Sequence, residues 1–492
     1  MRRSLARGSL LGLAALLVLP AAAMAQDDPP VSQVVDELNL TWVLVATVLV
    51  MFMQAGFALL EIGFSRGKNV GTGIAKILAN FSIASIAWWA VGFALAFGGA
   101  GKILGDSGFF FSIGGTISGG PVEGEIGGST TAFMIFQFMF CAVSLAIVWG
   151  TTLERIKFSA YVIYAIVFAA LIYPLGAHWI FGGGFLSEIG GGVQDFAGST
   201  VVHLVGATGA FAALLLLGPR RGKYGPDGKP RAIPGHSMPL AGLGVLILWL
   251  GWFGFNGGST LGTADGRFAE VILVTQLGAA GGVIGASLIV WMKTKALDVG
   301  MSGNGAIAGL VGITAPSGYV EFWAAPIIGL VAGFIVVFAV LAIEKKLDDP
   351  VGALSAHGLA GVWGTLACGL FTSDRLAEYN GIGVPGLLYS GSFEQLGVQA
   401  VGVAAAFVAV FSLSYGTFFL IKKTIGLRVS EQEEDAGLDI SSHGMYGYPE
   451  QFIPQPEFPS GLYEPTVAGT PLASSTPKRN ASAPMPEPSP QT

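Results

Sequence analysis

Two histidines stand out among the residues whose chemistry could serve a function. The chain has only five histidines, and His203 and His357 each lie several residues inside an apolar stretch. An ionisable side chain at that depth in a membrane span is a functional candidate by default. The alternative is a neutral histidine that bonds a backbone carbonyl of a neighbouring helix and has a packing role only.

A pair of imidazoles in apolar surroundings has limited chemistry. A neutral imidazole donates one hydrogen bond and accepts one, so two of them could relay a proton or hold a small polar molecule. Metal binding is the less favoured interpretation, because no third carboxylate or thiolate accompanies the histidines on their helices. Cys368 lies eleven residues from His357, about three helical turns away. We therefore expect no metal and no other cofactor.

The surroundings of the two histidines repeat along the chain. Asp195 stands eight residues before His203, and Asp349 stands eight residues before His357. Spaced glycines follow each histidine, and a chance match of spacing is the alternative explanation. Asp195 could cap the helix that carries His203 by accepting bonds from backbone N–H groups, or it could bind a cation directly. The repeat predicts two related halves with one histidine each.

The composition identifies the elements that must position these residues. Of the 492 residues, 52% are hydrophobic and 11% are charged, which is too little charge to cover a soluble domain. Eleven apolar stretches have about the length that crosses a bilayer. They run over 40–60, 77–101, 131–150, 158–180, 199–218, 238–258, 271–292, 299–315, 322–343, 351–372 and 395–421.

Charge placement supports eleven transmembrane helices, although the stretch 299–315 is short and rich in small residues. Lys and Arg gather in alternate loops, while the intervening loops carry only Lys102, Arg267 and Arg375. Because positive charge marks the cytoplasmic face, the mature N-terminus is expected outside and the C-terminus inside. Without the eighth span this alternation would fail.

The order of these elements predicts an all-α integral membrane protein with a 5+5 inverted repeat and one final helix. Five spans on each side of a basic loop place the halves in opposite senses, with a substrate site between them.

Residues 1–25 resemble a cleaved signal peptide, with an uncleaved first span as the alternative. The remaining divisions are an extracytoplasmic N-terminus at 26–39, the membrane domain at 40–425, a cytoplasmic C-terminal region at 426–448 and a disordered Pro/Ser-rich tail at 449–492.

Several motifs in order resemble one known family. The stretch DFAGSTVVHLVGATGAFAALLLLGPR from Asp195 is similar to the signature of the ammonium transporter (Amt/Mep/Rh) family, and the chain is most like its bacterial Amt branch. Nearly the whole membrane region shares the resemblance. The other motifs are GFALLEIGFSRGKN from Gly56, FQFMFC from Phe136, LERIKF from Leu153, GWFGFNGGS from Gly251 and DDPVGALSAHGLAGVWG from Asp348.

The resemblance implies a homotrimer of eleven-helix protomers, each with its own pore. His203 and His357 would be the paired pore histidines, and Phe140 and Phe255 would form a stacked phenyl gate. Further roles concern the outer face. The residues expected to recruit ammonium there are Ser259, Asp195, Phe181 and Trp252.

One recruitment position departs from the family pattern. The family usually has tryptophan immediately before the GGG of HWIFGGG, and this chain has Phe181 there, with Trp179 two residues earlier. Phenylalanine is a weaker cation–π partner than tryptophan. We therefore expect weaker recruitment of ammonium and an unchanged pore.

The implied function is nitrogen uptake across the bacterial cytoplasmic (inner) membrane. Ammonium would be recruited outside and deprotonated, and ammonia would pass the histidines with net movement of charge. A PII-type regulatory protein could bind the cytoplasmic face, although Met445 replaces the acidic residue that usually follows HG. The alternatives are an ammonium sensor that signals through its C-terminal region and an electroneutral channel for ammonia or carbon dioxide. We expect no enzymatic activity, because no nucleophile–base pair stands out, and no nucleic-acid partner.

Overall fold

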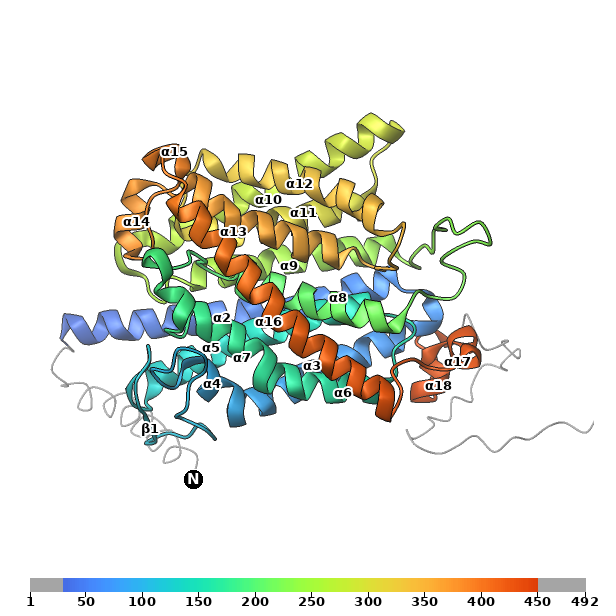
Figure 1. Ribbon diagram of the computed structural model, residues 1–492, viewed down its shortest axis with the longest axis horizontal. Helices are drawn as coiled ribbons and strands as arrows, with labels where there is room; N and C mark the ends of the chain where they lie inside the picture. Colours follow the sequence, from blue (N-terminus) through green and yellow to red (C-terminus); the bar gives the residue numbers. More distant parts are fainter. Residues whose placement is uncertain (1–29, 450–492) are drawn as a thin grey trace, which may run out of the picture. The chain divides into compact units, whose positions relative to one another are not determined.

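The fold is a bundle of long helices, seen in a computed structural model that describes residues 30–449 (Figure 1). Within that range ten helices or continuous helical runs are long and apolar enough to cross a membrane, and an eleventh apolar helix is shorter. The expected signal peptide and almost all of the expected tail lie outside the described residues. The eleven are Val31–Phe64, Gly67–Phe97, Gly128–Thr151, Phe158–Ser187, Ser199–Leu217, Met238–Gly258, Ala264–Thr294, Val299–Thr314, Ala324–Ile343, Leu354–Phe371 and Glu394–Thr424.

Several of these spans combine helical types. The α-helices are α2 (Val31–Phe64), α3 (Val70–Ala87), α4 (Phe93–Phe97), α5 (Gly128–Thr151), α6 (Phe158–Val167), α7 (Tyr173–Ile180), α8 (Val205–Leu217), α9 (Met238–Gly258), α10 (Arg267–Thr294), α11 (Val299–Thr314), α12 (Ala324–Ile343), α13 (Ala360–Phe371), α14 (Asp374–Asn380), α15 (Leu387–Ser390), α16 (Glu394–Thr424), α17 (Glu431–Ala436) and α18 (Leu438–His443). Of four π-helical segments in the described residues, η2 (Trp88–Gly92) and η3 (Phe168–Ile172) lie within spans, and η6 (Ser199–Leu204) and η9 (Leu354–Leu359) begin spans. Short 3-10 turns are η1 (Gly67–Asn69), η4 (Phe185–Ser187), η5 (Ile189–Gly191), η7 (Ala264–Gly266) and η8 (Pro316–Gly318). One small antiparallel ribbon pairs β1 (Thr116–Ile117) with β2 (Gly124–Glu125).

The eighth expected span is confirmed as helix α11. Asp298 caps its start, because the Asp298 side chain accepts a bond from the Met301 amide. Small residues allow this short helix to pack closely. A Cβ atom at Gly305 would lie 2.4 Å from the Ala286 methyl group of α10, so the two helices approach too closely for a larger side chain. Close approach of this kind supplies the packing that apolar burial cannot supply in lipid.

The first two spans are longer than the hydropathy indicated. Helix α2 begins at Val31 instead of residue 40, so the expected N-terminal segment 26–39 is largely helical in its described part. The second helical run begins at Gly67, ten residues before its expected start. Polar residues continue both helices beyond the apolar core, and a hydropathy count sees only the apolar portion.

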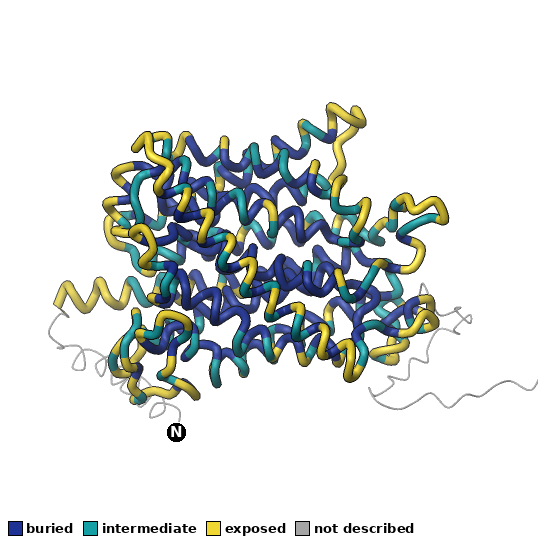
Figure 2. Tube along the Cα trace, in the orientation of Figure 1, coloured by how far each residue is buried: buried dark blue, intermediate teal, exposed yellow. Residues whose placement is uncertain are grey.

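The interior of the bundle is buried along its length, while exposed positions follow its ends and outer surface (Figure 2). Helices α17 and α18 lie at one end, and α14, α15 and β1 lie at the opposite end (Figure 1). The Asp439 carboxylate of α18 accepts bonds from the Gly71 and Thr72 amides at the start of α3. The region 426–448 is therefore docked on the membrane domain at the end where the basic loops gather.

Candidate functional site

His203 and His357 meet at the centre of the bundle. Their Nδ1 atoms are 3.2 Å apart, and the two ring planes are inclined by 19° with centroids 5.3 Å apart. His203 is fully buried and His357 is 5% exposed. The Nδ1 contact requires one ring to donate and the other to accept. The two halves of the chain thus bring together the pair that the repeat predicts.

The repeated aspartates hold the two helix starts in the same way. Asp195 accepts four bonds of 2.8–3.0 Å from the amides of residues 198–201. Asp349 accepts bonds from the Gly352 and Leu354 amides at 3.1 and 2.8 Å. Each aspartate is followed by a π-helical turn, η6 or η9, that contains the histidine. Such turns leave irregular backbone inside a span and often occur at functional sites.

The bonds to Asp195 decide between the two roles that its sequence position allowed. Both carboxylate oxygens accept bonds from backbone N–H groups at the start of η6, so the residue acts as a cap from four residues before the helix begins. Unpaired N–H groups at a buried helix start are costly, and a carboxylate also suits the positive end of the helix dipole. Asp195 therefore shapes the site through the backbone that it holds.

Two stacked phenyl rings separate the histidines from the outer end. The Phe140 and Phe255 rings are nearly parallel, with centroids 4.0 Å apart and planes inclined by 11°. The Phe255 ring also lies 5.7 Å from the His203 ring, and Phe136 makes an edge contact with Phe140. The stacked pair therefore lies between the outer cavity, which Phe140 lines, and the His203 ring.

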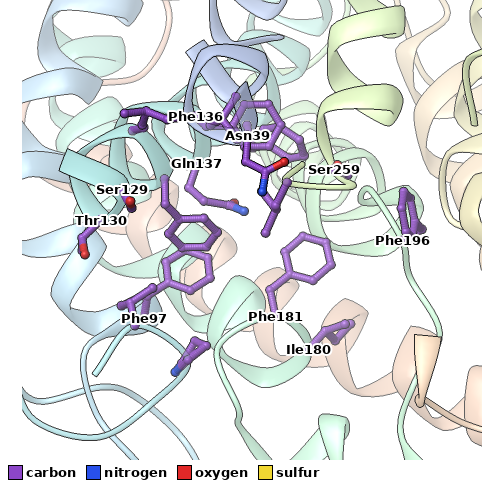
Figure 3. Close-up of a pocket in the computed structure, with 18 of the residues that line it drawn as sticks. Asn39, Phe97, Ser129, Thr130, Phe136, Gln137, Ile180, Phe181, Phe196 and Ser259 are labelled. Atoms are coloured by element: carbon purple, nitrogen blue, oxygen red, sulfur yellow. The ribbon is translucent and has the colours of Figure 1, made fainter. Parts of the chain in front are cut away.

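A cavity of about 670 Å³ lies outside the phenyl pair and contacts Phe140. Figure 3 shows the side chains of Asn39, Gln137 and Phe181 pointing toward its centre. Three carboxyl residues line it, Asp36, Glu123 and Asp195, and no lysine or arginine is among its lining residues. A cavity lined in this way favours a cation over an anion.

Aromatic faces and oxygen acceptors surround the inner part of this outer cavity. The Ser259 hydroxyl donates to the Phe255 carbonyl oxygen at 2.8 Å, which leaves its own oxygen free to accept a bond. Gln137 is 7% exposed, and its Oε1 atom has no hydrogen-bond partner in residues 30–449. Phe181 also lines the cavity. A small hydrogen-bond donor with positive charge matches these groups.

Trp252 does not lie where we expected it. The fully buried ring stacks on His203 with centroids 5.1 Å apart, its Nε1–H donates to Thr314, and it does not line the outer cavity. Ser259 marks the outer end of α9, and Trp252 precedes it by seven residues, or about 10 Å of helix. The placement of Trp252 at the entrance was therefore wrong, and the ring forms a wall beside the histidines.

The sequence reasoning passed over two polar residues of the pathway. Gln137 follows Phe136 in the outer cavity, and Glu61 lines a second, smaller cavity together with His357. Both stand in otherwise apolar helices, which is the signal by which the histidines were found. Applied to every polar residue within the expected spans, the same rule would have selected Gln137. Glu61 lies one residue beyond the expected span 40–60 and within the observed α2.

From the outside inward, the site consists of a cation-compatible cavity, a phenyl barrier and a buried imidazole pair. An isolated cation in the apolar interior is costly, so this arrangement favours an uncharged species beyond the barrier. Within residues 30–449, no group of three or more histidine, cysteine or acidic residues could hold a metal ion.

Comparison with known proteins gives consistent results across the chain. A family model described as the Ammonium Transporter Family matches residues 41–448. The chain is 43% identical to the ammonium transporter Amt2 of Archaeoglobus fulgidus over 467 residues, which cover 92% of this chain and 97% of that protein. It is 34% identical to an ammonium transporter of Bacillus subtilis, with 81% of this chain and 96% of that protein covered.

Solved structures agree with the sequence comparisons. A protein described as a sensor Amt protein superposes with a TM-score of 0.76 at 36% identity, covering 84% of this chain and 99% of that chain. Mep2 of Candida albicans superposes with a TM-score of 0.73 at 28% identity, covering 82% of this chain and 89% of that chain.

Proposed function

Because the chain belongs to the Ammonium Transporter Family, we propose that it recruits ammonium outside, deprotonates it and conducts ammonia inward past His203 and His357. Proton and ammonia then recombine on the inner side, so that net charge crosses the membrane. The observation that carries the proposal is the buried imidazole pair behind the stacked phenyl rings.

Charge explains why this geometry selects ammonium. Ammonium can lose a proton at the phenyl barrier and continue as a neutral molecule, whereas potassium cannot shed its charge. A buried, unpaired cation costs several kcal/mol or more, so potassium stays outside. The neutral imidazoles offer one donor and one acceptor each, which suits ammonia in single file.

Recruitment takes place in the outer cavity. Ser259 and Phe181 line it and provide an oxygen acceptor and an aromatic face for the cation. Asp195 supports this site by holding the start of η6. Phe140 and Phe255 form the gate below the site.

Electrical recording tests the role of the histidines. The variant His203→Leu/His357→Leu, reconstituted in liposomes on a solid-supported membrane, should lose the ammonium-driven current of the unaltered chain. The physical reason is that leucine can neither donate nor accept a proton. A double variant with unchanged current and unchanged ammonium/potassium selectivity would remove the histidines from the mechanism.

Assembly and location complete the proposal. Amt and Mep relatives support a membrane-embedded oligomer, and we propose a homotrimer with one pore per protomer in the bacterial inner membrane. Residues 1–25 then serve as a cleaved signal peptide, and a PII-type protein binds the cytoplasmic face. The proposed activity is transport and involves no enzymatic step or cofactor.

A sensor function is the second candidate, because one structural neighbour is described as a sensor Amt protein and because residues 426–448 dock on α3. Ammonium flux with and without residues 427–492 separates the two candidates. A transporter moves ammonium in the full-length chain, whereas a pure sensor binds it without appreciable flux.

A neutral gas channel for ammonia or carbon dioxide would conduct its substrate without any electrical current.

A further inference from the structure

A second cavity lies on the inner side of the histidine pair. Its volume of about 20 Å³ is enough for about one water molecule. His357 and Glu61, near the inner end of α2, both line it, as do Gly150 and Asn304. Glu61 lies three residues before the end of α2, next to the basic loop at the cytoplasmic end.

Glu61 is an acid without a partner. It is 1% exposed, and neither carboxylate oxygen has a hydrogen-bond partner within residues 30–449. A buried carboxylate that serves packing alone is normally hydrogen-bonded, because an unpaired one costs several kcal/mol. The carboxylate therefore faces a transient partner, such as a water molecule in the cavity or the substrate.

An opposite charge that acts on Glu61 is also unpaired. Lys76 of α3 is fully buried, its Nζ atom has no hydrogen-bond partner in the described chain, and it interacts electrostatically with Glu61 without forming an ion pair. Its Nζ atom lies 5.5 Å from the centroid of the Trp149 ring. The other titratable groups facing the two residues are Glu154 and Arg155 after α5, Tyr161 of α6, His357 of η9 and His443 of α18.

We propose that Glu61 is the proton acceptor at the inner end of the pathway, where it receives the proton that passes the histidines and transfers it to ammonia. The inference rests on the proposed function. In the first step, a water molecule in the cavity carries the proton from the His357 side to the Glu61 carboxylate. In the second, the ammonia lone pair forms an N–H bond to that proton, and the O–H electron pair remains on Glu61. Ammonium then leaves toward the cytoplasm.

Lys76 acts on this acceptor through its charge. A positive charge near a carboxylate favours the ionised form, which is the form that accepts a proton, so removal of that charge favours the protonated form. The charge of Lys76 beside Glu61 therefore affects the pH range in which Glu61 can accept a proton.

The test compares ammonium-driven currents of full-length variants in liposomes over a series of pH values. Glu61→Gln keeps the shape of the side chain but cannot carry a proton, and we expect its current to fall about tenfold or more. Glu37→Gln is the matched control, because it makes the same change at an exposed position of the same helix, and it should keep the full current. Lys76→Met should retain current with its pH dependence shifted to higher pH.

The outcomes separate the inference from the proposed function. Full current in Glu61→Gln overturns the inference and leaves ammonium transport intact. If the unaltered chain carries no ammonium current, the proposed electrogenic function fails and the inference fails with it. If Glu61→Gln loses both current and thermal stability, the Lys76→Met profile decides: a shifted pH dependence supports the proton role, and an unshifted profile overturns it.

Discussion

At the scale of single residues, the side chains on the two sides of the phenyl rings differ in the kind of solute that they can stabilise. The outer cavity offers Phe181, Ser259 and the unpaired Gln137 oxygen to a cation. Behind the phenyl pair, the His203 ring lies beside the Trp252, Phe255 and His357 rings. In the proposed mechanism, one layer of phenyl groups thus separates recognition of a cation from passage of a neutral molecule.

Phe181 provides a test of recruitment at this scale. Phe181→Trp should lower the half-saturating ammonium concentration of the transport current roughly two- to fivefold, because tryptophan improves cation–π attraction by about 0.5–1 kcal/mol. The measurement is a concentration series of ammonium-driven current. The variant Phe393→Trp, at a largely exposed position, should leave the concentration unchanged. An unaltered value in Phe181→Trp would show that the ring does not contact the cation.

At the scale of elements, close helix contacts hold the second half together. Helices α10 and α12 approach where Gly329 faces Gly278, and a Cβ atom added at Gly329 would lie 1.9 Å from the Gly278 carbonyl oxygen. Backbone atoms on both sides leave no flexible group to move aside. The contact between α10 and α12 therefore requires glycine at this position.

Gly329→Ala should destabilise the protein by about 1–3 kcal/mol, because the added methyl group forces the helices apart. The readout is the midpoint of thermal unfolding in detergent. Gly397→Ala in α16 is the matched control, since nothing lies within 4 Å of its Cβ position, and removal of a helical glycine there should be neutral or slightly stabilising. Equal midpoints for the two variants would contradict the close-contact argument.

At the scale of the whole molecule, buried ion pairs join distant loops at the cytoplasmic end. Asp348 binds Arg220 through two bonds of 2.9 and 3.0 Å, and the Arg155 Nη2 atom donates to the Asp348 carbonyl oxygen at 2.8 Å. Glu154 binds Arg66 in the loop after α2. These contacts connect both halves of the repeat beside the histidine helices.

The pH dependence of stability tests this cluster. Burial alone would raise the pKa of Asp348, but the Arg220 hydrogen bonds and the charges of Arg155 and Arg220 lower it to about 2. Because this folded-state pKa lies below the unfolded value of about 3.9, the ionised carboxylate stabilises the fold above pH 4. That stability, about 2–3 kcal/mol, is lost as the pH falls from about 4 to 2.

Asp348→Asn should therefore lower the thermal midpoint at neutral pH and flatten its decline between about pH 4 and 2. The isosteric amide keeps the shape of the side chain while it removes the charge. Asp227→Asn serves as the control, because Asp227 lies in an exposed loop. A decline in Asp348→Asn as steep as that of the unaltered chain would assign the acid sensitivity to other groups.

The sequence by itself was sufficient for the membrane class, the helical spans and the repeated Asp–His spacing. Apolar length and loop charge are local properties that every segment carries in its own residues. The weak helix 299–314 was identified in this way, because the charges on both sides required it. The starts of α2 and of the helical run that contains α3 were missed. Polar residues lengthen these helices beyond the apolar stretch that a hydropathy count detects.

Only the tertiary structure decided which side chains meet. The Nδ1 contact of His203 and His357, the position of Trp252 against His203 and the shared cavity of Glu61 and His357 join helices from both halves. Such contacts depend on how helices rotate and cross when they pack, and residue spacing within one helix does not specify that rotation. The sequence thus determined which titratable residues the spans carry, and the packing of the two halves determined which of them lie close together.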